Sequence, residues 1–203
     1  MMWPGLLPHA SVLQLCIRWI DDLEEVLSSM ISSIPERFPA AARIELRCSN
    51  GPAERLDACL AALPDQSWPA VEAVRYRTRQ PAATAAHIAR QCPWLDELSC
   101  ELDDIKGLAA ALEGLAPAAD TLEELSLSIE KPVEPGAAVP RAAEALRQLG
   151  GLQRLVVGKW EGPGAEQLLA LALPALASLS SLEVTALEDS ADAQPREIDL
   201  RSL

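Results

Sequence analysis

The chain has few aromatic residues and few histidines, and each shortage narrows what it can do. Only 3% of its 203 residues are aromatic: one phenylalanine, one tyrosine and five tryptophans. A core with so few rings suits thin, repeated layers better than one large globular centre. The two histidines, His9 and His87, stand in no metal-binding or triad spacing. We therefore expect no catalytic site, no metal and no cofactor.

Positive charge is also scarce. The sequence has 17 lysines and arginines against 30 acidic residues, a net charge of −13 and a pI near 4.6. A field of that sign repels nucleic-acid phosphates and anionic lipid surfaces. We therefore expect neither a nucleic acid nor a membrane as the partner.

Two kinds of sequence signal are missing as well. None of the five cysteines forms a C-x-x-C pair, and the odd number indicates reduced thiols rather than a disulfide framework. No run of 18 apolar residues occurs, and the start lacks the basic region of a secretory signal. These features predict a soluble cytoplasmic or nuclear protein, and they leave its oligomeric state open.

What the sequence does contain is a recurring pattern. Each copy of the pattern begins with an apolar residue that is often followed by proline. Counted from that first residue, the fourth, seventh and ninth residues are also apolar. The copies begin at Leu7, Phe38, Trp68, Cys92, Ala119, Leu149 and Leu176. Their spacing averages about 28 residues, within the range of leucine-rich repeats. We expect one domain, residues 1–203, with about seven repeats.

Within each copy the apolar period changes from two to about 3.6, as it must where a strand is followed by a helix. In the first copy, apolar residues recur at three- and four-residue steps from Leu23 to Ile34. The weakest helical pattern is the one around Thr84 to Arg90. Strands that alternate with helices predict parallel strands joined by right-handed crossovers.

The expected strands alternate between apolar and polar residues. The clearest examples are 43–47, 74–77, 97–101 and 124–128. A doubly wound sheet would bury both faces, and its strands would read as apolar runs. The pattern instead favours an α/β solenoid, a horseshoe with a parallel concave sheet and convex helices. Residues 188–203 are expected to form an irregular cap or a partial repeat, with Ile198 and Leu200 as strand anchors.

Four blocks resemble leucine-rich repeats of the ribonuclease-inhibitor-like class: CPWLDELSC (92–100), TLEELSLSI (121–129), GLQRLVVGK (151–159) and SLEVTAL (181–187). The Cys-Pro start of the first block resembles the repeats of F-box/leucine-rich-repeat proteins, a family that selects substrates for a ubiquitin ligase. The chain has no F-box. It also lacks the Asn or Cys ladder of the family, because these positions hold Arg18, Ser49, Arg79, Asp103, Glu130, Trp160 and Leu187.

Charged residues are distributed unevenly along the chain. Residues 37–80 hold seven arginines against five acids, whereas residues 94–134 hold eleven acids against two lysines. The two-residue period of a strand places both groups on the concave face. The candidate binding residues are Arg43, Arg47, Arg75, Arg77, Glu97, Glu101 and Glu124. Either they neutralise one another, or the arginines bind an acidic or phosphorylated segment of a protein partner.

Other conspicuous residues have structural explanations. Asp103 and Asp104 precede an apolar helical series, so helix capping explains them better than metal or acid–base chemistry. Trp68 and Trp94 flank prolines and are expected to pack where the chain enters a strand.

The function predicted from these patterns is a non-catalytic protein-interaction module that binds its partner on the concave strand face. Two alternatives stay open. The chain is either the substrate-recognition fragment of an F-box-type ubiquitin ligase, or a structural fragment of a longer repeat protein.

Overall fold

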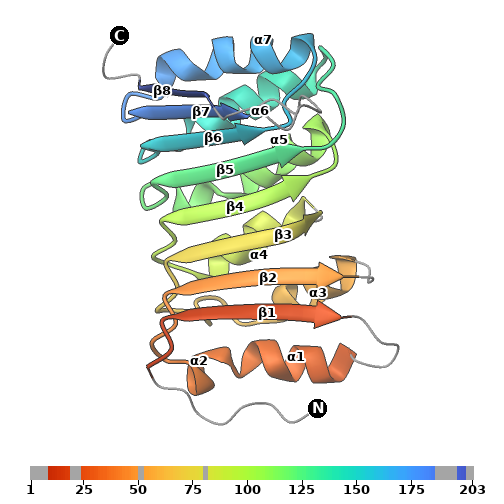
Figure 1. Cartoon of the computed structure of the whole chain (residues 1–203), viewed down its shortest axis with the longest axis vertical. Coiled ribbons are helices and arrows are strands. Elements are labelled where there is room, and N and C mark those ends of the chain that lie inside the picture. The colour runs from red at the N-terminus through yellow and green to blue at the C-terminus, as the bar shows by residue number, and fades with distance from the viewer. Residues whose placement is uncertain (1–8, 19–23, 50–52, 80–81, 186–195, 200–203) are drawn as a thin grey trace.

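A computed structural model describes residues 9–18, 24–49, 53–79, 82–185 and 196–199 of the chain. The strands of these segments form one sheet (Figure 1). They are β1 (Val12–Arg18), β2 (Arg43–Ser49), β3 (Ala73–Arg79), β4 (Glu97–Leu102), β5 (Glu124–Ile129), β6 (Arg154–Gly158), β7 (Ser181–Thr185) and β8 (Arg196–Asp199).

The strands lie side by side in the order in which they occur in the chain. Each of β1 to β7 pairs in parallel with the next, and the register aligns the expected anchors, such as Leu98 with Leu125 and Leu125 with Leu155. The pairing of β3 with β4 contains a register shift between Arg75 and Arg79. The prediction of an α/β chain with a parallel sheet is confirmed.

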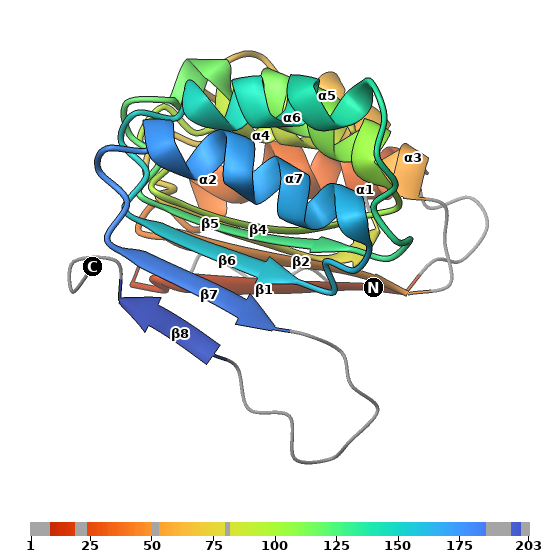
Figure 2. The same ribbon diagram turned by 90° about the horizontal axis from the view of Figure 1, so that it is seen from above.

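All described α-helices lie on one side of the sheet (Figure 2). They are α1 (Glu24–Ser32), α2 (Ile34–Arg37), α3 (Ala53–Ala61), α4 (Ala83–Gln91), α5 (Ile105–Gly114), α6 (Ala138–Arg147) and α7 (Pro163–Ala172). The longer helices pack in a row in which α3 contacts α4, α4 contacts α5, and so on to α7. No helix of the described chain is both long and apolar enough to cross a membrane.

The core lies between this helix layer and the sheet. The seventh-position anchors of the sequence pattern are buried there, with Ile44, Leu98 and Leu125 at 0% exposure. Helix α4, which had the weakest apolar pattern, buries Thr84, Ala85, Ile88, Ala89 and Gln91. Its inner face consists mainly of small or polar residues, which explains why a search for large apolar residues barely detected it.

The C-terminal strand differs in direction from the others. Strand β8 pairs antiparallel with β7, with Leu182 opposite Ile198. Only residues 186–195 connect the two strands. A parallel crossover needs a dozen or more residues, so this connection is too short for one. Ile198 therefore does belong to an eighth strand, whereas Leu200 lies outside the described residues.

The turns that lead into the strands show one error in the sequence-based expectations. Trp68 is buried as expected, at 1% exposure, but Trp94 is 65% exposed. Trp94 occupies the third position of its copy, as Ala40 and Ala70 do in theirs, and both alanines are exposed. This position points outward in each of these turns, so the prediction that Trp94 packs inside was wrong.

A backbone ladder runs along the edge of the sheet at which β1 to β7 begin. The carbonyl group before each of the strands β1 to β6 accepts two successive N–H groups of the next copy; for example, the Glu72 carbonyl accepts from Asp96 at 2.7 Å and from Glu97 at 3.2 Å. Equivalent carbonyls are those of Ser11, Ala42, Asp96, Glu123 and Gln153. The residues of this ladder are thereby held in one row.

Candidate partner-binding surface

The sheet face away from the helices, here called the open face, carries the predicted binding residues. No described helix covers it (Figure 2). Arg43, Arg47, Arg75, Glu97, Glu101 and Glu124 have partly or fully exposed side chains that alternate with buried anchors. Arg77 lies in β3, but its side chain is outside the described residues. The structure thus brings the described candidates to one surface.

One ion pair on this face spans a strand. Arg43 of β2 and Glu97 of β4 lie on either side of Ala73 of β3 in the strand register. Both terminal nitrogens of Arg43 donate to the Glu97 carboxylate, with Nη1 at 3.4 Å from Oε1. Alanine at the middle position leaves room for this ion pair, which lies across it, and Ala73 is only 5% exposed.

The other described arginines of the face also have carboxylate partners. Nη2 of Arg75 lies 3.4 Å from Oε1 of Glu97, and Nε of Arg47 lies 2.8 Å from Oε1 of Glu45. Exposed pairs of this kind contribute about 0–1 kcal/mol each. Their main effect here is electrostatic, because Glu97 and Glu45 offset much of the positive charge predicted for this part of the face.

A second ion-pair group lies further along the sheet. Arg154 of β6 contacts Glu183 of β7 at 2.9 Å and Glu124 of β5 at 4.0 Å. Sequence reasoning missed both Arg154 and Glu183, although each falls at a polar position between strand anchors. Between the two ion-pair groups the face carries small side chains, those of Ser99, Ser126 and Ser128.

Sequence reasoning also missed three carboxylates at the edge of the open face. Glu72, Asp96 and Glu123, here called the acidic row, are the ladder residues that precede β3, β4 and β5. All three are exposed, and none has an ion-pair partner among the described side chains. The fixed fifth position of the repeating pattern was the signal that could have revealed them.

The middle member of the row has a perturbed pKa. Partial burial, followed by the negative charges of Glu72, Glu97 and Glu123, raises the pKa of Asp96 above its ordinary value. Burial and the crowding of like charges at one edge of the sheet both disfavour the charged form of this carboxyl group. This edge therefore favours any group that brings positive charge to it.

A hollow of about 360 Å³ lies at the same edge, across the starts of β1 to β5. Small or apolar residues line part of it, namely Ser11, Val12, Ala42 and Ala73. The remaining lining residues are Arg43, the acidic row, Glu97 and Glu124. The hollow thus combines small or apolar residues with five carboxylates and one arginine.

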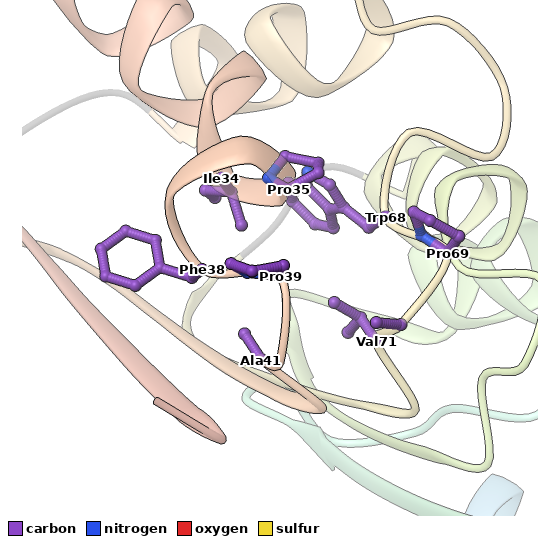
Figure 3. Close-up of a pocket in the computed structure, with 9 residues that line it drawn as sticks. Ile34, Pro35, Phe38, Pro39, Ala41, Trp68, Pro69 and Val71 are labelled. Atoms are coloured by element: carbon purple, nitrogen blue, oxygen red, sulfur yellow. The ribbon is translucent and has the colours of Figure 1, made fainter. Parts of the chain in front are cut away.

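A separate, smaller pocket of about 150 Å³ lies between two successive strand-entry turns (Figure 3). The residues that line it are Ile34, Pro35, Phe38, Pro39, Ala41, Trp68, Pro69, Ala70 and Val71. Its lining side chains are apolar and carry no group suited to acid–base or nucleophilic chemistry.

Charged and polar groups outside the open face have structural roles. The Asp104 carboxylate accepts from the N–H groups of Lys106 and Gly107 at 3.1 and 2.9 Å, so its predicted capping role is confirmed. Asp57 accepts a hydrogen bond from Thr84 at 2.8 Å and lies 3.6 Å from His87, which ties α3 to α4. Among the described residues, no group of three or more potential ligands could hold a metal ion.

No family model matches the sequence, and no curated protein matches it either.

Proposed function

We propose that this chain is a leucine-rich-repeat solenoid that works as a non-catalytic interaction module and binds a protein partner on its open face. The observation that carries the proposal is the one-sided parallel sheet, which helices cover on one face only. Parallel sheets normally have both faces covered by helices. Repeat proteins are the main exception, and they use the uncovered face for recognition.

The spacing of the strands supports the repeat assignment. Their anchors recur about every 28 residues, and the same backbone ladder joins successive copies. The resemblance of residues 92–100 and 121–129 to ribonuclease-inhibitor-like repeats agrees with this arrangement. Helices take up the remainder of each copy, as a strand–helix repeat of this length requires.

The centre of the open face is suited to contact with a polypeptide. A strip of small side chains lies between the Arg43–Glu97 and Arg154–Glu183 ion pairs. It consists of Ser99, Ser126 and Ser128. A partner segment that lies on this strip can approach the sheet closely and meet charged side chains on both sides. This arrangement provides shape and charge for recognition without a reactive group.

A blocking experiment tests the proposal. We would replace Ser99 and Ser126 with arginine and compare the proteins captured by the tagged variant and by the wild type, using quantitative mass spectrometry. The matched control is Ala110→Arg with Gln167→Arg, which adds the same charge on the exposed sides of α5 and α7. Loss of specific partners from the open-face variant alone is the expected result.

The same experiment can overturn the proposal. If the helix-side control loses the partners and the open-face variant keeps them, the partner binds on the helix layer. Circular dichroism of both variants establishes that each is folded before the captured proteins are compared.

A further inference from the structure

The charge of the open face indicates which kind of partner it accepts. Each described arginine of the face already has a carboxylate partner: Glu97 for Arg43 and Arg75, Glu45 for Arg47, and Glu183 for Arg154. An incoming carboxylate or phosphate would have to compete with these ion pairs. The arginines are therefore a weaker attraction for an acidic segment than their number in the sequence suggests.

The acidic row has the opposite property. Glu72, Asp96 and Glu123 lie on neighbouring strand starts and have no cationic partner among the described side chains. Glu97 and Glu124 line the same hollow, so five carboxylates face it against one arginine, and Glu97 already engages that arginine. Among the described side chains, the charge that remains available to a partner is negative and lies at one edge of the open face.

The hollow also fits the shape of a basic side chain. Lysine and arginine combine a long apolar stem with a charged head, and they bury the stem against apolar surface. Val12, which is 59% exposed, and Ala42 line the side of the hollow at the starts of β1 and β2, and the acidic row lines the side at the starts of β3 to β5. A stem can pack on the first side while its charged head reaches the second.

We propose that the partner of the open face presents a basic segment, and that a lysine or arginine of this segment occupies the hollow and contacts Glu72, Asp96 and Glu123. This inference rests on the proposed function, because it names the partner class of the same sheet face. It assigns the partner a charge opposite to that of the acidic or phosphorylated segment predicted from the arginines.

Peptide binding to the full chain tests the inference. The probes are three fluorescent peptides of equal length that contain alternating serine and lysine, serine and glutamate, or serine and phosphoserine. We would measure their fluorescence anisotropy at low salt. The expected result is that only the lysine peptide binds and that its affinity falls as salt is added.

Two triple variants with equal changes in net charge separate a site from general attraction to an acidic protein. Glu72→Gln, Asp96→Asn and Glu123→Gln remove the acidic row, whereas Glu134→Gln, Glu161→Gln and Glu166→Gln remove exposed carboxylates elsewhere. We expect the first variant to bind the lysine peptide more than tenfold more weakly than wild type, and the control to stay within twofold. Equal losses, or tighter binding of either anionic peptide, would overturn the inference.

Failure of this inference can be distinguished from failure of the proposed function. In one outcome, arginines at Ser99 and Ser126 abolish partner capture, whereas loss of the acidic row does not affect it. The open face then binds a partner that places no basic residue in the hollow, so this inference is wrong and the proposed function stands. If the lysine peptide needs the acidic row but partners are captured independently of Ser99 and Ser126, the edge site stands and the proposed open-face function falls.

Discussion

The two faces of the sheet have the same backbone and opposite chemistry. On the covered face, Ile44, Leu98 and Leu125 are 0% exposed and meet the helix layer. On the open face, one residue away in sequence, the side chains of Arg43 and Glu124 are 44% and 36% exposed. Alternation within each strand therefore separates the residues of the core from those proposed to bind a partner, and a substitution on one face need not disturb the other.

The largest difference in stability is expected in the strand-entry turns, where Trp68 is buried and Trp94 is exposed. Trp68→Ala should lower the free energy of unfolding by about 4 kcal/mol, because it empties a fully buried site. Trp94→Ala should change it by less than about 0.5 kcal/mol, because the ring is largely in water. Chemical denaturation of both variants checks this; similar losses would show that Trp94 is buried in solution.

Neighbouring residues of β5 provide the next test. Leu125→Ala creates a cavity beneath the helices and should cost about 3 kcal/mol. Ser126→Ala, on the open face, should stay within about 0.5 kcal/mol of the wild type. Urea titrations measure both values. A large loss for the serine variant would mean that the open face also carries structural contacts.

The helix-covered side of the sheet also contains a buried polar side chain, that of Gln91. Its side chain is fully buried, donates to the carbonyls of Leu60 and Leu63 at 3.5 and 3.3 Å, and accepts from the Ser67 N–H at 3.3 Å. Gln91→Leu keeps the volume but removes these three hydrogen bonds, so it should cost about 2 kcal/mol. An unfolding midpoint equal to that of the wild type would contradict this bracing role.

A smaller effect is expected at the edge of the open face, where Asp96 has a raised pKa. The native state holds this proton more tightly than the unfolded chain, so stability falls as pH rises from the ordinary pKa of 3.8 through the raised one. Asp96→Asn should therefore melt at a higher temperature than wild type at neutral pH. The difference should vanish below the ordinary pKa, where the carboxyl is protonated in both states. A lower melting temperature at neutral pH would be the opposite result.

The reactivity of the cysteine thiols should report the difference between exposed and buried positions without any change to the sequence. Cys16 is exposed, whereas Cys92 and Cys100 are buried, and burial raises the pKa of the Cys92 thiol to about 12. At pH 8 an alkylating agent should modify Cys16 in the native protein and reach the buried thiols only after unfolding. Peptide mass mapping before and after denaturation checks this order.

Most of the strands and their parallel order were predictable from the sequence, because they follow from local alternation of apolar and polar residues. Leu98, Leu125 and Leu155 were assigned as anchors from spacing alone, and they align in the sheet. The antiparallel direction of β8 was not predicted, because it follows from the length of the preceding connection rather than from side-chain pattern. The exposed Trp94 was misjudged because hydrophobic character alone does not give the direction in which a turn residue points.

The candidate surface was only partly predictable. Alternation placed Arg43 and Glu97 on the same face, but an ion pair across the intervening strand requires the small Ala73 between them, which becomes evident only from the register. The acidic row was missed because Glu72, Asp96 and Glu123 are far apart in sequence, and each was an ordinary variable position. Stacking of the copies turns three unremarkable residues into one charged edge.

The chain-order pairing of the strands has a mechanical consequence. Each strand from β1 to β7 is hydrogen-bonded only to strands that are its neighbours in the chain. A force applied at the two ends would therefore pass through the strand pairs in series, and resistance to stretching would be set by the weakest pair rather than by their sum. The register shift between β3 and β4 is one irregularity in this series of strand pairs.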